Sequence, residues 1–241
     1  MKGKLYIVST PIGNLKDITI RALDVLKEVD IVAAEDTRRA QKLLNHYEIK
    51  VKTISYHSHN EHRVTENVLD LIETGKNIAI VTDAGTPCIS DPGFFLVREA
   101  IEREIEPIII PGVSAVTFAA CASGLPVDTF TFYGFLHVKQ GRRHRAIAKI
   151  KEEDKTVFVY ESPHRMEKLL KEISELISPE TKVAVIREAT KVYEEVLRGT
   201  AKELVEQTAQ RKWKGECVVA ISTKHLHETN KKKNKYPKEV D

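Results

Sequence analysis

One short segment of the chain concentrates residue types that proteins use to hold ligands. Residues 82–93 (TDAGTPCISDPG) contain two glycines, two prolines, two aspartates and a serine. Glycine lets a backbone approach a ligand closely, proline stiffens a loop, and aspartate accepts hydrogen bonds. We therefore expect this loop to bind a ligand; an elaborate surface loop is the alternative.

The flanking sequence places this loop at the end of a strand. Residues 77–81 (NIAIV) form a short apolar run typical of a buried strand, and residues 94–103 show a helical pattern. In open α/β sheets, ligands bind at the carboxyl ends of the strands. The position of the loop therefore agrees with its composition.

Strand-like and helix-like segments alternate along the first half of the chain. Strands are expected at residues 4–9, 31–34, 51–56, 77–81 and 107–110, and helices at 18–29, 37–47, 64–74, 94–103 and 113–122. This alternation predicts a mostly parallel sheet with helices on both faces.

A second domain is expected after the SGLP turn at residues 123–126. Its predicted strands are 130–133, 156–160, 182–187, 194–197 and 216–222, and its predicted helices are 143–153, 165–177 and 201–210. Several of these strands follow one another directly, which favours a mixed sheet. The predicted domains are residues 1–124 and 125–223, and the lysine-rich tail 224–241 is expected to be disordered.

Composition narrows the class of protein. The 241 residues are 41% hydrophobic and 30% charged, as is usual for a globular protein, and the apolar runs are too short to span a membrane. Three widely spaced cysteines indicate neither a disulfide framework nor a zinc site, and favour a reducing cytoplasm. GxGxxG, P-loop, HExxH, CxxC and GxSxG motifs are all absent.

The basic residues are unevenly distributed. Residues 129–151 contain no acid, but hold six lysines and arginines, two histidines and several aromatic side chains. This composition fits contact with a polyanion, or one solvated helix face beside a strand.

Polar loops follow the predicted strands throughout the chain, and together they resemble one family. In chain order, the matching motifs are STPIGNLKDITIRAL, AAEDTRR, HNEH, TDAGTPCISDPGF, IPGVSA, ASGLP, GFL, VYESPHR, REATKVYEEVLRGT and KGE. They resemble the bacterial ribosomal RNA small subunit methyltransferase I family from Leu5 to about Ser222. The departures include Cys88, which stands where glycine is common, with His137 for proline and Ala189 for leucine.

The resemblance implies a fold and an activity. The expected fold is α/β: two α/β domains of the tetrapyrrole methylase (class III methyltransferase) type with a cofactor cleft between them. The implied activity is S-adenosylmethionine-dependent methylation of the ribose 2′-hydroxyl of a cytidine in 16S ribosomal RNA. The implied partners are the small ribosomal subunit and a second copy of the chain, in the cytoplasm and without a membrane.

The resemblance also implies which residues line the cofactor pocket. In the first domain these are Pro11, Asp83, Ala84, Gly85, Thr86, Ile89, Ser114 and Ala115, and in the second they are Glu161, Glu188 and Gly215. Asp83 is alternatively a loop-stabilising residue that bonds its own backbone.

The residue that accepts the proton of the attacking hydroxyl is left open. Five carboxylates on strand-end loops are candidates: Glu35, Asp36, Glu61, Asp91 and Glu188. Glu35 and Asp36 stand beside two arginines, so an ion pair that orders the loop is an equal alternative to catalysis.

Contacts with RNA are expected from basic and polar residues in both halves. The candidates are Arg38, Arg39, His59, Asn60, Lys139, Arg142, Arg143, Arg145, Arg165 and Lys191. His57, His59 and His62 do not have the spacing of a metal site, so no metal is expected.

Two other functions are compatible with parts of this pattern. A small-molecule, tetrapyrrole-type methyltransferase would account for the cofactor loops but not for the basic stretch. A non-catalytic RNA-binding protein would account for the basic stretch but not for the dense strand-end loops.

Overall fold

The computed structural model describes residues 2–224 and divides into two compact units, Met1–Ser114 and Ala115–Asp241. The domain boundary therefore lies between Ser114 and Ala115, and the predicted boundary at 124–125 is wrong. The helix after this point, α5 (Ala115–Ser123), packs its apolar side chains against the second sheet, which assigns it to the second unit. Apart from Lys224, the predicted tail lies outside the described residues.

Unit 1 is built on a five-stranded sheet that is entirely parallel. Its strands are β1 (Leu5–Val8), β2 (Ile31–Ala34), β3 (Lys52–Ser55), β4 (Ile78–Val81) and β5 (Ile108–Ile110). Their order is β3-β2-β4-β1-β5. Strands β2 and β4 are completely buried, as expected for strands covered on both faces.

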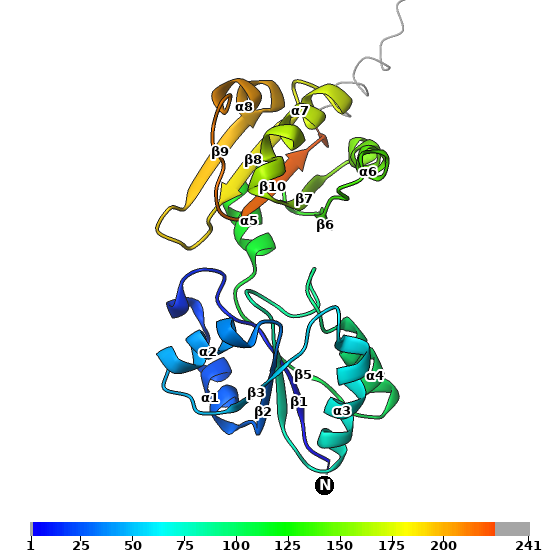
Figure 1. Cartoon of the computed structure of the whole chain (residues 1–241). Coiled ribbons are helices and arrows are strands. Elements are labelled where there is room, and N and C mark those ends of the chain that lie inside the picture. Colours follow the sequence, from blue (N-terminus) through cyan, green and yellow to red (C-terminus); the bar gives the residue numbers. More distant parts are fainter. Residues whose placement is uncertain (1, 225–241) are drawn as a thin grey trace, which may run out of the picture. The chain divides into compact units, whose positions relative to one another are not determined.

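Helices cover both faces of this sheet (Figure 1). Successive strand residues point to opposite faces, so Ile7 packs with α3 (Glu61–Glu73) and α4 (Phe94–Glu102), whereas Val8 packs with α1 (Ile20–Glu28) and α2 (Thr37–His46). Thr19 caps α1 and Asp36 caps α2, each accepting a hydrogen bond from a backbone N–H of the first turn. A 3-10 turn at Leu15–Asp17 precedes α1.

Unit 2 contains a mixed five-stranded sheet. Its strands are β6 (Phe130–Phe135), β7 (Thr156–Glu161), β8 (Lys182–Arg187), β9 (Glu195–Thr200) and β10 (Cys217–Ser222). Their order is β6-β7-β10-β8-β9, and only the β6–β7 pair is parallel.

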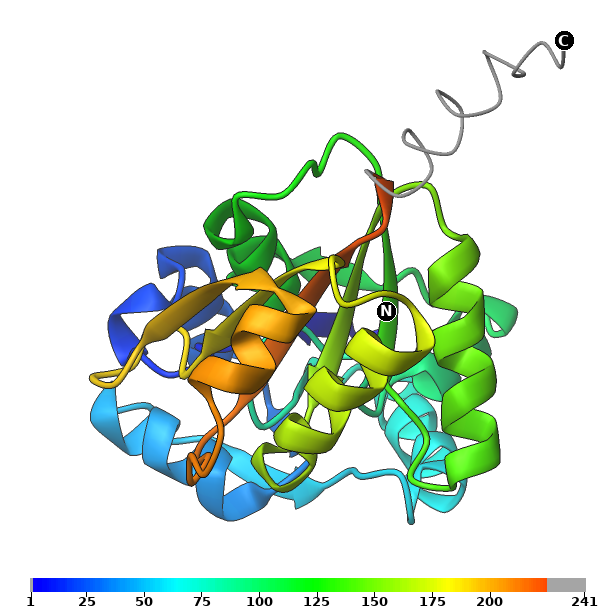
Figure 2. The same cartoon turned by 90° about the horizontal axis from the view of Figure 1, so that it is seen from above.

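Three helices cover one face of this second sheet and α5 covers the other. These three are α6 (Gln140–Glu152), α7 (Met166–Leu176), which follows a 3-10 turn at Pro163–Arg165, and α8 (Ala201–Gln207). Figure 2 shows α7 in yellow-green and α8 in orange lying over the sheet. A reciprocal capping box between Thr200 and Glu203 begins α8 directly after β9. Among the described residues, no helix is both long and apolar enough to cross a bilayer.

Candidate functional site

The loops after β1 and β4 are joined at the carboxyl edge of the unit 1 sheet. Thr10 and Gly85 exchange two backbone hydrogen bonds, with N–O distances of 2.8 and 3.0 Å. Ser9 Oγ and Thr86 Oγ1 lie 3.0 Å apart. These contacts hold the predicted cofactor residues Asp83, Ala84, Gly85 and Thr86 beside Pro11, as the order β4-β1 requires.

The β4 loop has an unusual backbone. Gly85, Cys88, Ser90 and Gly93 all have positive φ angles, of 82°, 74°, 64° and 131°. The left-handed region is unfavourable for a residue with a side chain, and such strain collects at functional sites. Cys88 thus has a backbone conformation that suits glycine, the residue that is common at this position in the family that the chain resembles. The Cys88 N–H donates to Pro92 O at 3.2 Å, which closes the turn.

Three side chains from two strand ends form one hydrogen-bond network in this loop. Glu35 Oε2, after β2, accepts from Thr82 Oγ1 at 2.9 Å and from Asp83 N at 3.3 Å. Asp83 Oδ1 accepts in return from Asp36 N at 3.1 Å, and Asp83 Oδ2 lies 3.4 Å from an Arg39 guanidinium nitrogen. Thr82 was not among the predicted site residues; its place at the end of a buried strand was the available signal.

The carboxylates of the β4 loop, Asp83 and Asp91, have few positive charges near them. Burial, followed by the charges of Glu35 and Asp83, raises the pKa of Asp91 to about 6, although a hydrogen bond to Thr82 opposes the rise. Burial and the charge of Glu35 also raise the pKa of Asp83, although Arg39 opposes the rise. This edge of the sheet is therefore an acidic, half-buried surface that favours a cation or a proton.

Two other candidate bases are held as ions by close cations. Hydrogen bonds from Arg38 lower the pKa of Asp36 far below its ordinary value, and its carboxylate also caps α2. Burial raises the pKa of Glu188, but hydrogen bonds from Lys191 and Glu216 N outweigh it, so the net shift is downward. A strongly stabilised carboxylate is a poor proton acceptor.

The predicted cofactor residues of unit 2 meet at one edge of its sheet. Glu161 ends β7, Glu188 follows β8, and Gly215 precedes β10, which pairs with both strands at Cys217. A side chain at Gly215 would collide with the Glu188 carboxylate, and Gly215 has a φ of 83°. Gly215 therefore provides the space that Glu188 occupies.

Glu161 lies within a buried ionic network. Its Oε2 is 2.7 Å from Arg143 Nη2, and its Oε1 accepts from Ser162 N at 2.7 Å and from Arg165 Nε at 2.8 Å. Arg143 Nε also donates to Glu172 Oε2 at 2.5 Å. Arg143 is 1% exposed, so its prediction as an RNA contact is wrong: the guanidinium compensates two buried carboxylates.

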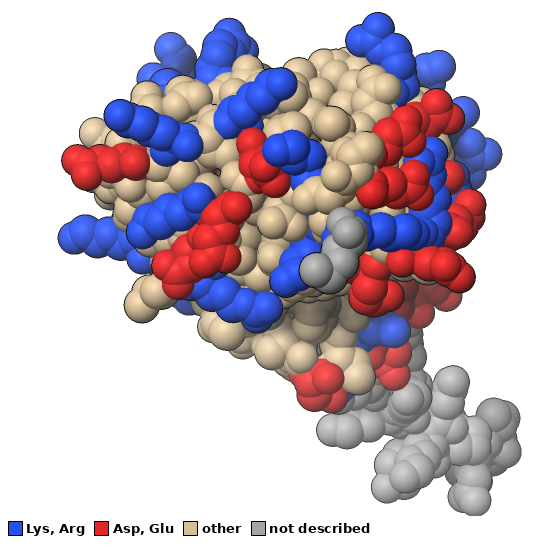
Figure 3. Space-filling view, turned by 90° about the horizontal axis from the view of Figure 1, so that it is seen from below, with Lys and Arg blue, Asp and Glu red and all other residues tan. Residues whose placement is uncertain are grey.

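The remaining basic side chains of α6 do face solvent. Arg142, Arg145, Lys149 and Lys151, together with Lys139 before the helix, are exposed. Helical periodicity turns Arg143, Ile147 and Ile150 inward and leaves these cations outside. On the face seen from below in Figure 3, by contrast, lysines and arginines are interspersed with aspartates and glutamates.

The histidine segment between β3 and α3 is a structured loop. The Asn60 side chain accepts from His57 N at 2.8 Å and donates to Ser55 O at 3.1 Å, so both ends of its amide serve the loop itself. The His62 ring packs on Phe95 with centroids 4.3 Å apart, whereas His59 is exposed near His57. Within the described part of the chain, no group of three potential ligands is arranged to hold a metal.

Comparison with known proteins assigns this architecture to a family. Residues 4–205 match the family model described as Tetrapyrrole (Corrin/Porphyrin) Methylases. The chain belongs to the tetrapyrrole methylase family. Within this family it is 47% identical to the Ribosomal RNA small subunit methyltransferase I of Halalkalibacterium halodurans, across 90% of this chain and 75% of that protein. Proteins of the same name from Thermotoga maritima and Bacillus subtilis are 45% and 39% identical across 92% and 95% of this chain.

Solved structures agree on the fold. The uroporphyrin-III-C-methyltransferase from Thermus thermophilus has a TM-score of 0.66 at 19% identity, with 95% of this chain and 98% of that chain covered. A cobalt precorrin-4 methyltransferase has a TM-score of 0.66 at 22% identity, with 91% and 94% covered. The predicted fold class, two α/β domains of the tetrapyrrole methylase type, is confirmed.

Proposed function

We propose that this chain is an S-adenosylmethionine-dependent methyltransferase that modifies the ribose 2′-oxygen of a cytidine in 16S ribosomal RNA. The observation that carries the proposal is its 39–47% identity, over most of its length, to proteins named Ribosomal RNA small subunit methyltransferase I. The activity implies a cytoplasmic protein that meets the small ribosomal subunit, and we retain the homodimer of the resembling family as part of the proposal.

The chemistry of the unit 1 edge fits the cofactor. S-adenosylmethionine supplies a methyl group activated by a sulfonium, and it carries an ammonium as well. Asp83 and Asp91 both have raised pKa values because burial and neighbouring acids disfavour their charge. A cationic ligand would relieve that cost. We propose Pro11, Ala84, Gly85, Thr86 and Ile89 as its further contacts in unit 1, with Ser114 from the segment after β5.

We propose Asp91 as the group that accepts the proton of the attacking hydroxyl. A general base works best when its pKa is near the working pH, and the pKa of Asp91 is raised to about 6. Asp36 and Glu188 are stabilised as anions. One carboxylate oxygen of Glu35 already accepts hydrogen bonds from Thr82 and from the backbone of Asp83. Glu61 lies in the first turn of α3, where it stabilises the helix start.

We propose that RNA is bound first by the exposed cations of unit 2, Lys139, Arg142 and Arg145. Arg38, Arg39, Arg165 and Lys191 already pair with carboxylates, so each gains less from a phosphate. His59 is exposed and remains a candidate contact.

In the second unit, we propose that Glu161, Glu188 and Gly215 contribute to the cofactor pocket. Gly215 leaves room for the Glu188 carboxylate at the edge of the sheet, and Glu161 fixes the position of the loop that follows it.

Incubation with labelled S-adenosylmethionine and three acceptors tests this function. The acceptors are small ribosomal subunits, naked 16S RNA and a tetrapyrrole such as uroporphyrinogen III. Transfer to ribosomal RNA, followed by digestion to 2′-O-methylcytidine, is the expected result. A methyl group on a base, or transfer only to the tetrapyrrole, would contradict the proposal. The comparison of subunits with naked RNA also identifies the state of the substrate.

A further inference from the structure

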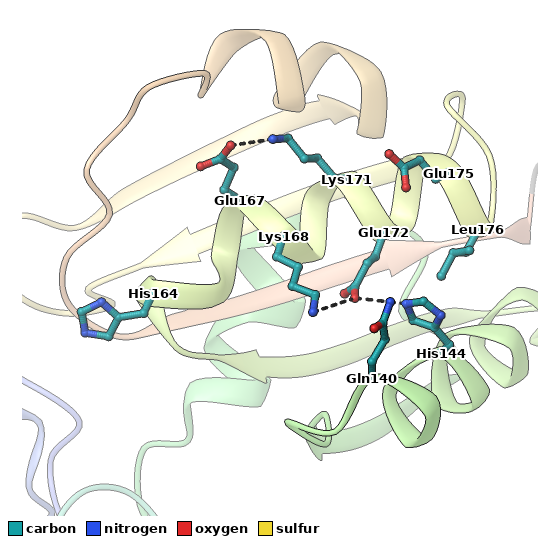
Figure 4. Close-up of a pocket in the computed structure, with 9 residues that line it drawn as sticks. All are labelled: Gln140, His144, His164, Glu167, Lys168, Lys171, Glu172, Glu175 and Leu176. Carbon is teal, nitrogen blue, oxygen red and sulfur yellow. Dashed lines mark hydrogen bonds and ion pairs between the residues drawn. The ribbon is translucent and has the colours of Figure 1, made fainter.

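A groove in unit 2 lies outside the sites described above. It runs between α6 and α7 and has a volume of about 410 Å³. Figure 4 shows the side chains that line it. They are Gln140, His144, His164, Glu167, Lys168, Lys171, Glu172, Glu175 and Leu176. This volume is in the range of pockets that hold small organic ligands.

The floor of the groove is a buried carboxylate, one oxygen of which accepts no hydrogen bond from the described residues. The Glu172 side chain is 7% exposed, and its Oε2 accepts from Arg143 Nε at 2.5 Å. Its Oε1 is buried and has no hydrogen-bond partner among the described residues. The nearest side-chain nitrogens are His144 Nε2 at 3.4 Å and Lys168 Nζ at 3.8 Å, and neither makes a hydrogen bond with this oxygen. A buried acceptor in this state gains from any ligand that donates to it.

The cover over this oxygen is movable. The His144 and Lys168 side chains are 38% and 51% exposed, and both come from the walls of the groove. Because both side chains are partly exposed, we expect rotation of either to open Glu172 Oε1 to the groove without moving a helix. The displaced lysine then stands at the rim, where it can pair with an anion.

The charges around the groove restrict what can bind. A simple anion would be repelled by Glu167, Glu172 and Glu175, and a simple cation by Lys168, Lys171 and Arg143 behind Glu172. A ligand that carries both a hydrogen-bond donor and an anionic group suits both sets. A nucleotide whose base bears an amino group has this combination, since carboxylates accept from the amino group of cytosine and lysines pair with phosphates.

We propose that the α6–α7 groove is a binding site for an unpaired, amino-bearing nucleotide of ribosomal RNA, with Glu172 accepting from the base and Lys168 pairing with its phosphate. The proposal rests on the proposed function for the source of the nucleotide. It extends the RNA surface from the exposed face of α6 onto α7. The site is distinct from the methyl-transfer chemistry, which we assign to unit 1.

Nucleoside monophosphates test the site directly. CMP and UMP are a matched pair, because one has an amino donor where the other has a carbonyl acceptor. Calorimetry or NMR titration of the full chain, saturated with S-adenosylhomocysteine to block the cofactor site, should show CMP binding about tenfold more tightly than UMP, as expected for one charge-assisted hydrogen bond. Equal affinities, or no binding of either, would overturn the proposal.

Variants locate the binding within the groove. Lys168→Ala and Gln140→Trp should each weaken CMP binding at least about fivefold, the first by removing the phosphate partner and the second by filling the space. Lys202→Ala, an exposed lysine on α8, is the matched control and should bind CMP as the unaltered chain does. Unchanged CMP affinity in both groove variants would also overturn the proposal.

Methylation assays separate this inference from the proposed function. With small subunits as substrate, Lys168→Ala should raise KM several-fold and leave kcat and cofactor affinity unchanged. If the unaltered chain does not methylate ribosomal RNA, the proposed function fails, and selective CMP binding still reports on the groove. If the unaltered chain methylates and Lys168→Ala has the same KM, the groove has no part in RNA binding.

Discussion

Arg143 Nη2 lies 2.7 Å from Glu161 Oε2, and neither side chain is more than 1% exposed. This ion pair joins the first turns of α6 to the end of β7 beneath the second unit's surface. Glu172 of α7 completes it, and Arg165 extends it toward solvent. One arginine in a basic segment therefore stabilises the fold, whereas its neighbours Arg142 and Arg145 are exposed.

Removing this arginine should destabilise the protein. Arg143→Ala leaves Glu161 and Glu172 without their shared cation in a buried environment, and loss of one partner of a buried pair costs about 3–5 kcal/mol. Urea unfolding followed by circular dichroism measures the loss. The adjacent Arg142→Ala is the control and should change stability by less than about 0.5 kcal/mol. Equal stabilities for the two variants would remove the structural role of Arg143.

The proton acceptor should be visible in the pH dependence of methylation. The pKa of Asp91 is raised to about 6, so its active, ionised form is lost as pH falls through that value. The value of kcat/KM for S-adenosylmethionine, which reports the free protein, should therefore rise with pH and reach half its plateau near pH 6. Asp91→Asn should lower kcat by about 10²–10⁴-fold and abolish this rise with pH. A variant that keeps both the rate and its pH dependence would exclude Asp91 as the base.

Asp83 should contribute to cofactor affinity. Its carboxylate orders the backbone of Asp36 and pairs with Arg39, and it lies in the loop joined to β1. Asp83→Ala should weaken S-adenosylmethionine binding by about 1.5–3 kcal/mol, the range for a hydrogen bond to a charged group. Calorimetry measures the Kd for S-adenosylmethionine of the folded variant and of the unaltered chain. An added chelator should leave both values unchanged, since no metal is involved. An unchanged Kd would assign Asp83 to loop structure alone.

The exposed cations of α6 should set the salt dependence of RNA binding. Replacing Lys139, Arg142 and Arg145 by alanine removes up to three phosphate contacts and spares the buried Arg143. Each lost contact should reduce the slope of log Kd against log salt by roughly 0.7–0.9. Filter binding of ribosomal RNA over a range of salt concentrations measures the slope. Unchanged slope and affinity would mean that this helix face only solvates the protein.

Gly215→Ala should disturb the edge of the second sheet. The new Cβ would collide with the Glu188 carboxylate, and alanine at a φ of 83° adds about 1–2 kcal/mol of strain. The expected result is lower stability together with weaker cofactor binding. Gly141→Ala is a suitable control, since a Cβ there meets nothing within 4 Å. If Gly215→Ala matched that control in both measurements, the predicted collision between its Cβ and the Glu188 carboxylate would be wrong.

Sequence and structure agree best where the signal is local. Alternating apolar strands and amphipathic helices predict the α/β class because both periodicities follow from backbone geometry, and most elements lie within a few residues of their predicted ranges. The order of the strand-end motifs identifies the family for a related reason: each motif is a short, contiguous segment. The predicted boundary at 124–125 failed because the turn at 123–126 is a local signal, whereas the packing of α5 on the second sheet is not.

By itself, the sequence determined the fold class, the family and the positions of the strand-end loops. The tertiary structure alone decided which charged side chains are solvated and which are compensated inside the protein. Arg142 and Arg143 are adjacent in the chain, yet a rotation of about 100° per residue around the helix sends one to solvent and the other to Glu161. The raised pKa of Asp91 likewise depends first on burial, which no single segment specifies, and then on Glu35, which the neighbouring strand β2 brings to the same sheet edge.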